Sequence, residues 1–177
     1  MSARLAREEG GFGLVELVIA IAILNVVILA LFATFHAGSL ALQRASRIST
    51  AETVADKQME LYRAHLYDSI GLESSLVTAA AGDATHTGDS AWVSAGSQIT
   101  AATCTTAVDE CKPVRTNVTG ADGRTYRVDT YVRQVTLASG RPVKKATVVV
   151  RGSDGKVLAR LSTTFDLATG CMSGASC

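Results

Sequence analysis

The residue that calls for a chemical explanation is Glu16, a carboxylate near the start of a long apolar run. An ionised carboxylate at bilayer depth costs about 2.5–3.5 kcal/mol on insertion scales, so it usually has a partner. If the chain is cut after Gly11, Phe12 gains a free α-amino group four residues before Glu16. The spacing therefore predicts an amine and a carboxylate at the same membrane depth, which can pair between neighbouring copies.

The apolar run that follows is long enough to cross a membrane. Between Leu17 and Phe35 only Asn25 and Thr34 carry polar side chains. A helix of these 19 residues is about 28 Å long, close to the hydrocarbon thickness of a bilayer. A cleaved secretory signal has a shorter apolar core and a small-x-small cleavage site. The length of the run and its carboxylate argue against such a signal. A plain signal anchor, which is not cleaved, is a second alternative interpretation of this run.

Gly11, Phe12 and Glu16 resemble the processing motif of the type IV pilin-like family. In that family a short leader ends in glycine, phenylalanine becomes the new N-terminus, and glutamate is the fifth mature residue. The resemblance covers roughly the first 25 residues. It implies cleavage between Gly11 and Phe12 by a membrane prepilin peptidase, N-methylation of Phe12, and assembly into a filament in which Glu16 pairs with the Phe12 amine of an adjacent subunit.

An amphipathic helix is predicted to continue beyond the membrane run. Small or apolar residues recur at steps of three or four, which is the pattern of one helix face packed on a protein domain. The charged residues fall largely off this stripe. Its members are Ala41, Ala45, Ile48, Ala51, Ala55, Met59, Tyr62 and Leu66.

The last third of the chain has the pattern of an antiparallel strand meander. Turn signals at 121–123, 139–142 and 153–155 separate segments in which apolar and polar residues alternate. Strands of this kind need one covered face, which the amphipathic half of the helix can supply. Before the sheet comes a connection rich in Ala, Ser, Thr and Gly, and Trp92 is expected to pin it to the sheet, with a binding contact as the alternative.

These patterns together predict an α+β fold: a long N-terminal helix, first transmembrane and then amphipathic, packed on a small antiparallel β-sheet. This is also the architecture of the type IV pilin-like family. The expected divisions are a leader at 1–11, a transmembrane and filament-core helix at 12–35, its amphipathic half at 36–68, a variable connection at 69–111, and the sheet with a disulfide-pinned tail at 112–177.

The four cysteines all follow the membrane run, which favours disulfides in an exported domain. Proximity favours pairing Cys104 with Cys111 and Cys171 with Cys177, although the other two connectivities stay open. None belongs to a C-x-x-C pair and the three histidines lie far from them in the sequence, so a zinc site has little support.

The sequence contains no catalytic motif, and its net charge of +1 gives no reason to expect a nucleic acid partner. We therefore expect a structural subunit with no cofactor or metal: a minor pilin of a type IV pilus, because 55–62 resembles the helix of minor pilins. The expected partners are the prepilin peptidase, other pilin subunits, the assembly platform with its ATPase, and the membrane.

Two alternatives stay open. One is a pseudopilin of a type II secretion or DNA-uptake machine. The other is a single-pass membrane-anchored binding protein that never polymerises. In the pilin interpretation the chain sits in the cytoplasmic membrane with its C-terminal domain exported, and moves to a surface filament on assembly.

Overall fold

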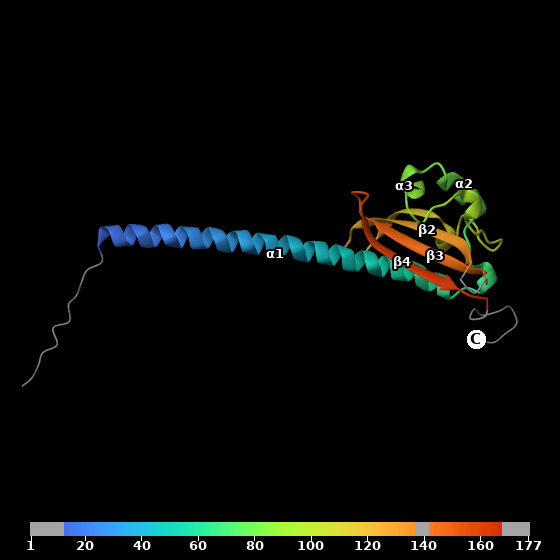
Figure 1. Ribbon diagram of the computed structural model, residues 1–177, viewed down its shortest axis with the longest axis horizontal. Coiled ribbons are helices and arrows are strands. Elements are labelled where there is room, and N and C mark those ends of the chain that lie inside the picture. Colours follow the sequence, from blue (N-terminus) through green and yellow to red (C-terminus); the bar gives the residue numbers. More distant parts are fainter. Residues whose placement is uncertain (1–12, 137–141, 168–177) are drawn as a thin grey trace, which may run out of the picture. The chain divides into compact units, whose positions relative to one another are not determined.

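The computed structural model describes residues 13–136 and 142–167, and they fall into two compact units, Met1–Arg44 and Ala45–Cys177 (Figure 1). Helix α1, Leu14–Arg63, begins in the first unit and ends in the second. The first unit contains the apolar half of α1, and the second contains the amphipathic half together with the sheet. The long N-terminal helix and the antiparallel sheet confirm the predicted α+β fold.

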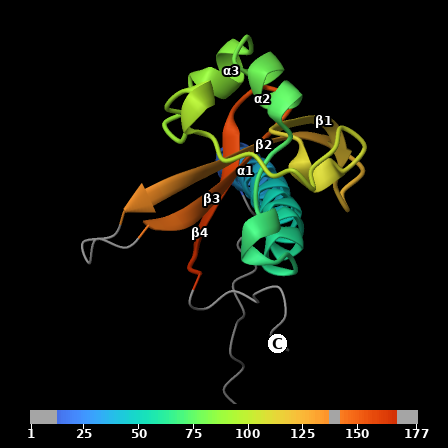
Figure 2. The same cartoon turned by 90° about the vertical axis from the view of Figure 1, so that its right-hand side faces the viewer.

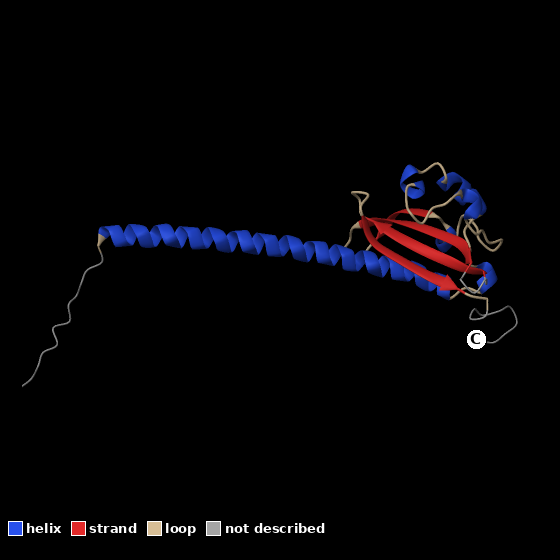
Figure 3. Cartoon of the chain, in the orientation of Figure 1, coloured by secondary structure: helices blue, strands red, loops and turns tan. Residues whose placement is uncertain are grey.

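Four strands form the sheet in the order β1-β2-β3-β4, with every neighbouring pair antiparallel (Figure 3). Their bounds are Val114–Thr119 for β1, Thr125–Thr136 for β2, Pro142–Arg151 for β3 and Val157–Phe165 for β4. The predicted meander is therefore confirmed. The predicted turn at 139–142 lies largely outside the described residues, but Thr136 pairs with Pro142 on either side of it.

The two Asp-Gly turns form as the sequence predicts. Gly123 and Gly155 have φ angles of 72° and 74°, a left-handed conformation that residues with a Cβ rarely adopt. Backbone bonds close both hairpins, from Gly120 N to the Arg124 carbonyl at 2.9 Å and from Gly152 N to the Lys156 carbonyl at 3.0 Å.

One face of the sheet packs on the C-terminal half of α1, and this contact forms the main hydrophobic core (Figure 2). Ala51, Ala55, Met59 and Tyr62 are buried there, as the stripe predicts. The stripe is wrong at its ends, because Ile48 and Leu66 are each 42% exposed, and the buried helix face includes Val54 and Gln58 instead. The strands contribute Val128, Val132, Ala146, Val148, Val150 and Ala159.

The opposite face of the sheet is covered as well, although the sequence predicts only one covered face. The connection crosses it with two short helices, α2 at Ser74–Ala80 and α3 at Ala84–Thr87 (Figure 2). Trp92 lies against a second core cluster of Ala91, Tyr131 and Val149, so it does pin the connection to the sheet. Three single 3-10 turns complete the connection: η1 at Tyr67–Ser69, η2 at Ala95–Ser97 and η3 at Asp109–Cys111.

Candidate assembly site

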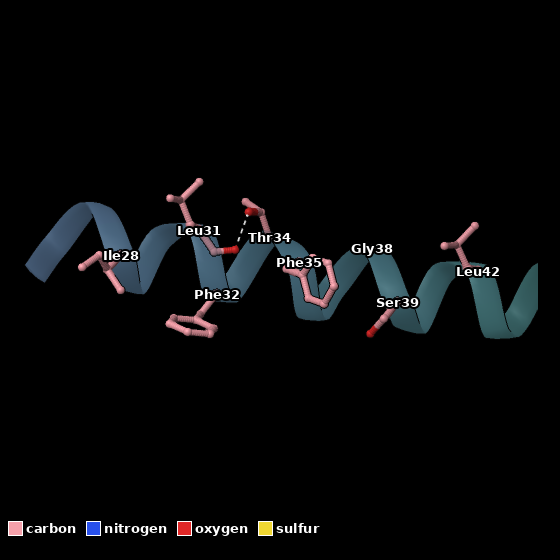
Figure 4. Close-up of a pocket in the computed structure, with 8 residues that line it drawn as sticks. All are labelled: Ile28, Leu31, Phe32, Thr34, Phe35, Gly38, Ser39 and Leu42. Carbon is pink, nitrogen blue, oxygen red and sulfur yellow. Dashed lines mark hydrogen bonds between the residues drawn. The ribbon is translucent and has the colours of Figure 1, made fainter. Parts of the chain in front are cut away.

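The first unit presents an apolar helix surface that no other part of the described chain covers. Leu14 is 81% exposed and Phe35 is 79% exposed, and the large apolar residues between them are exposed too. Figure 4 shows Ile28, Leu31 and Phe32 pointing away from the helix backbone. In the described residues, α1 is the one helix long and apolar enough to cross a membrane. Such a surface needs lipid or other helices as its solvent.

The polar side chains within this surface are satisfied by the helix itself. Asn25 donates through Nδ2 to the Ile21 carbonyl at 2.9 Å, and the Thr34 hydroxyl donates to the Leu31 carbonyl at 2.9 Å (Figure 4). Unpaired polar groups in hydrocarbon cost several kcal/mol each. Because these bonds stay within one helix, Asn25 and Thr34 are compatible with an apolar environment.

Glu16 lies in the first turn of α1, where the backbone N–H groups have no helical partners and a carboxylate is favoured. The thirteen Leu, Ile, Val and Phe side chains between residues 17 and 35 favour insertion by about 4–8 kcal/mol in total. That exceeds the cost of one carboxylate, which is about 3 kcal/mol. The helix can therefore enter a membrane with Glu16 in place, and the charge remains a local cost that a cation would relieve.

The predicted cleavage residues Gly11 and Phe12 lie outside the described residues, as do Cys171 and Cys177. Of the predicted site residues, the structure describes Glu16, Cys104 and Cys111. The two cysteines form the predicted disulfide, with their Cα atoms 5.5 Å apart.

The disulfide loop holds the C-terminal end of α1. The Glu110 carbonyl accepts hydrogen bonds from Gln58 Nε2 at 3.3 Å and from the Tyr62 hydroxyl. Burial raises the pKa of Tyr62 well above its ordinary value, so this hydroxyl remains a donor. Arg115 donates to Gln58 Oε1 at 3.1 Å and to Asp109 at 2.8 Å, which joins strand β1 to the same contact.

A buried charge cluster holds the connection on the other face of the sheet. Asp129 of β2 has no exposed surface, yet it accepts bonds from Arg127 at 2.8 Å and Arg151 at 3.0 Å. Arg127 also reaches Asp83 at 2.7 Å, immediately before α3. Asp89 accepts from Arg151 and, at 2.8 Å, from Arg160 of β4. Three carboxylates on two segments are thus neutralised by three guanidinium groups on the sheet.

His86 of α3 completes this cluster. Its ring stacks on Tyr131 with the centroids 4.4 Å apart, meets Trp92 edge to face at 5.2 Å, and places Nδ1 3.3 Å from Asp129. The ring is fully buried, so no substrate can reach it. Every carboxylate of the cluster is paired with arginine, which suits the docking of a segment and not acid–base chemistry. Among the described residues, no group of three or more His, Cys, Asp and Glu side chains could hold a metal.

Sequence reasoning missed this cluster. The alternation of Arg127 and Asp129 with apolar neighbours predicts a strand but does not indicate that these charged residues are buried. A signal was present, because Asp83, His86 and Asp89 are spaced three residues apart in a connection otherwise poor in charge. Their arginine partners cannot be identified before the strand register is known.

A long apolar N-terminal helix packed through its second half on a four-stranded antiparallel sheet is an α+β layout like that of the type IV pilins. Residues 7–32 match the family model for the prokaryotic N-terminal methylation motif, the type IV prepilin-like signature. The match supports a type IV pilin-like precursor. No curated protein and no solved structure matches the chain.

Proposed function

We propose that this chain is a prepilin whose mature form is a structural subunit of a type IV pilus or a related filament. Gly11 presents the bond that a prepilin peptidase cuts, and Phe12 becomes the methylated N-terminus. Glu16 then pairs with the Phe12 amine of an adjacent subunit. The apolar half of α1 leaves the lipid on assembly and packs with the same half of other subunits.

The observation that carries this proposal is the methylation motif at residues 7–32, which extends into an exposed apolar helix. The same surface suits both environments that a pilin meets, because it needs only apolar neighbours. It fits membrane anchoring before assembly and a surface filament afterwards. The assembly platform and its ATPase are the further partners that this function requires.

Within the family we infer a minor subunit. The support is the resemblance of residues 55–62 to the helix of minor pilins. In this chain the same stretch also packs against the sheet, through Ala55, Met59 and Tyr62. A minor subunit is expected at low copy number, so quantitative mass spectrometry of sheared filaments should find it well below the most abundant subunit. Equal or greater abundance would make it the major pilin.

The first experiment is intact-mass and N-terminal analysis of the protein from the native membrane and from the sheared surface fraction. Processing as a prepilin gives an N-terminus at methylated Phe12, and filament membership places that species in the sheared fraction. An intact leader in a strain whose prepilin peptidase processes its other substrates would contradict the proposal and leave a membrane-anchored protein.

A further inference from the structure

A polar cavity of about 430 Å³ lies in the second unit, where the tips of two hairpins meet helix α1. The β1–β2 hairpin contributes Gly123, Arg124 and Thr125, the β3–β4 hairpin contributes Gly152 and Ser153, and the helix contributes Arg47. We call it the hairpin-tip pocket. Both hairpins and the helix belong to one compact unit, so the pocket is part of the folded domain.

Arg47 is the reason to expect a ligand here. The side chain is half-buried, and its Nε is buried without a hydrogen-bond partner among the described residues. Arg47 also forms no ion pair with any described residue. By contrast, carboxylates bond to four other arginines, which are Arg115, Arg127, Arg151 and Arg160. A buried unpaired donor costs free energy unless water or an ion satisfies it.

The remaining donors of the pocket are also free to bind. Among the described residues, Arg124 forms one long ion pair, in which its Nε lies 4.0 Å from the Asp122 carboxylate. That carboxylate is already bonded to the Tyr126 hydroxyl at 2.7 Å and to the Arg124 backbone N–H at 3.1 Å. The hydroxyls of Thr125 and Ser153 form no side-chain hydrogen bond with the described residues.

Gly152 of the second hairpin lies beside the Arg47 guanidinium. A Cβ built on Gly152 would lie 3.6 Å from Arg47 Nη2 and 2.8 Å from the Asp154 carboxylate. Asp154 in turn accepts a bond from the Lys156 backbone N–H at 3.3 Å. Each acidic residue at the hairpin tips is therefore bonded within its own turn. Neither carboxylate occupies the hydrogen-bonding groups of Arg47.

We propose that the hairpin-tip pocket binds a phosphate group. Two guanidinium groups and two hydroxyls approach it from three separate elements, and a tetrahedral oxyanion with several acceptor oxygens can meet donors from several directions at once. A planar carboxylate has two oxygens in one plane and would leave part of this set unused. Arg47 follows Phe35, the end of the apolar run, by twelve residues. A lipid headgroup and a free phosphorylated solute are therefore the two sources of the phosphate.

The test uses the full chain in nonionic detergent and in phosphate-free buffer. Inorganic phosphate is titrated by isothermal calorimetry, with acetate at the same ionic strength as the carboxylate probe. We expect saturable binding of phosphate and weaker binding of acetate. Absence of saturable phosphate binding, or equal binding of acetate, would overturn the proposal.

Variants assign the binding to the pocket. Arg47→Gln and Arg124→Gln should each weaken phosphate binding about tenfold or more, because each removes a charged hydrogen-bond donor. Arg133→Gln is the matched control, since it removes an arginine of β2 that lines no part of this pocket. Ser153→Ala changes only an exposed hydroxyl and keeps the test available if Arg47→Gln fails to fold. Unchanged binding in both Arg124→Gln and Ser153→Ala would overturn the assignment.

The source of the phosphate is resolved in nanodiscs. Free phosphate is titrated into the full chain in phosphatidylcholine discs and in discs that contain phosphatidylglycerol. If a lipid headgroup fills the pocket, free phosphate will bind the wild type more weakly in both discs than in detergent, because both lipids carry a headgroup phosphate. Equal affinity in detergent and in both discs identifies a soluble phosphorylated ligand.

Discussion

At the scale of single residues, the charge of Glu16 matters more than its shape. Two unit charges 4 Å apart attract by about 4 kcal/mol at an effective dielectric constant near 20. This attraction offsets an insertion cost of about 3 kcal/mol, so a correctly paired Glu16 is more stable in apolar surroundings than an unpaired one. In the filament that we propose, this energy difference would select neighbours and register during assembly, and it would not affect cleavage.

We therefore predict that Glu16→Gln and Glu16→Val leave cleavage after Gly11 largely intact but sharply reduce incorporation into filaments. The measurement is the ratio of processed subunit in the sheared fraction to processed subunit in the membrane. Glu52→Gln is the matched control, because Glu52 is an exposed carboxylate on the same helix in the second unit. Normal incorporation of the two Glu16 variants would exclude the pairing model.

Asp129 is a second residue where charge decides the outcome. Burial alone would raise its pKa, but the hydrogen bonds from His86 and Arg127 and the positive charge of Arg127 outweigh burial and lower it. The same competition, with Arg127 as the principal partner, lowers the pKa of Asp83. Carboxyls with a lower pKa in the folded state stabilise the protein above the unfolded value, near 4. That contribution disappears as the pH falls through the folded pKa.

The expected result is a steep loss of unfolding free energy below about pH 4 in the wild type. In Asp129→Asn this loss should be smaller, because the variant already lacks the contribution. At pH 7 the variant should be less stable by about 3–5 kcal/mol, since Arg127 and Arg151 lose a buried partner. Urea unfolding at a series of pH values measures both effects. Asp56→Asn, at an exposed position of α1, should retain wild-type stability at pH 7, and equal stability of the two variants would contradict the prediction.

At the scale of elements, the disulfide loop acts as a clamp on the end of α1. The Glu110 carbonyl, which accepts from Gln58 and Tyr62, is adjacent to Cys111 in the chain. Closing this short loop, with its sequence separation of 7, stabilises the folded state by roughly 2.5 kcal/mol in the chain-entropy model.

Replacement of both Cys104 and Cys111 by alanine should therefore lower the free energy of unfolding by about 2.5 kcal/mol. It should also expose the end of α1, which hydrogen exchange at residues 58–63 would detect. The matched control replaces Cys171 and Cys177 by alanine, because it removes the same number of sulfur atoms from the chain. Faster exchange at 58–63 in the control, and not in the Cys104 and Cys111 variant, would disprove the clamp.

The elements differ in how far the sequence predicts them. The helix and the four strands follow from periodicity, and the hairpins from Asp-Gly pairs whose glycines adopt the left-handed conformation. The layer on the second face could not be predicted, because α2 and α3 are too short to show a period. The buried charges there violate the rule that alternating polar residues face solvent. Their burial is acceptable only because each carboxylate meets arginine, and those pairs depend on a register that forms with the fold.

At the scale of the whole molecule, the chain consists of two units with different solvents. The exposed apolar half of α1 requires lipid or other helices around it, whereas the core of the second unit uses α1 residues from Ala51 to Tyr62. The second unit therefore contains every helix residue that its own core requires.

A fragment that begins at Ala45 should consequently be monomeric and folded without detergent. Its circular dichroism should show a cooperative thermal transition. A fragment that begins at Ala64 lacks the helix that covers the sheet, and it should not fold. If the Ala45 fragment aggregates or melts without cooperativity, the apolar half of α1 is required for folding as well as for assembly.

The shared carboxylate of Asp89 also constrains how this chain can change over generations. Because Arg151 and Arg160 both bond to it, a single substitution at Asp89 removes one partner from each of two cations, and Arg151 keeps only its carboxylate contact with Asp129. We therefore expect a change at this position to lower the free energy of unfolding unless a compensating change on β3 or β4 accompanies it. Across related chains we expect Asp83 and Asp89 to change together with their arginine partners.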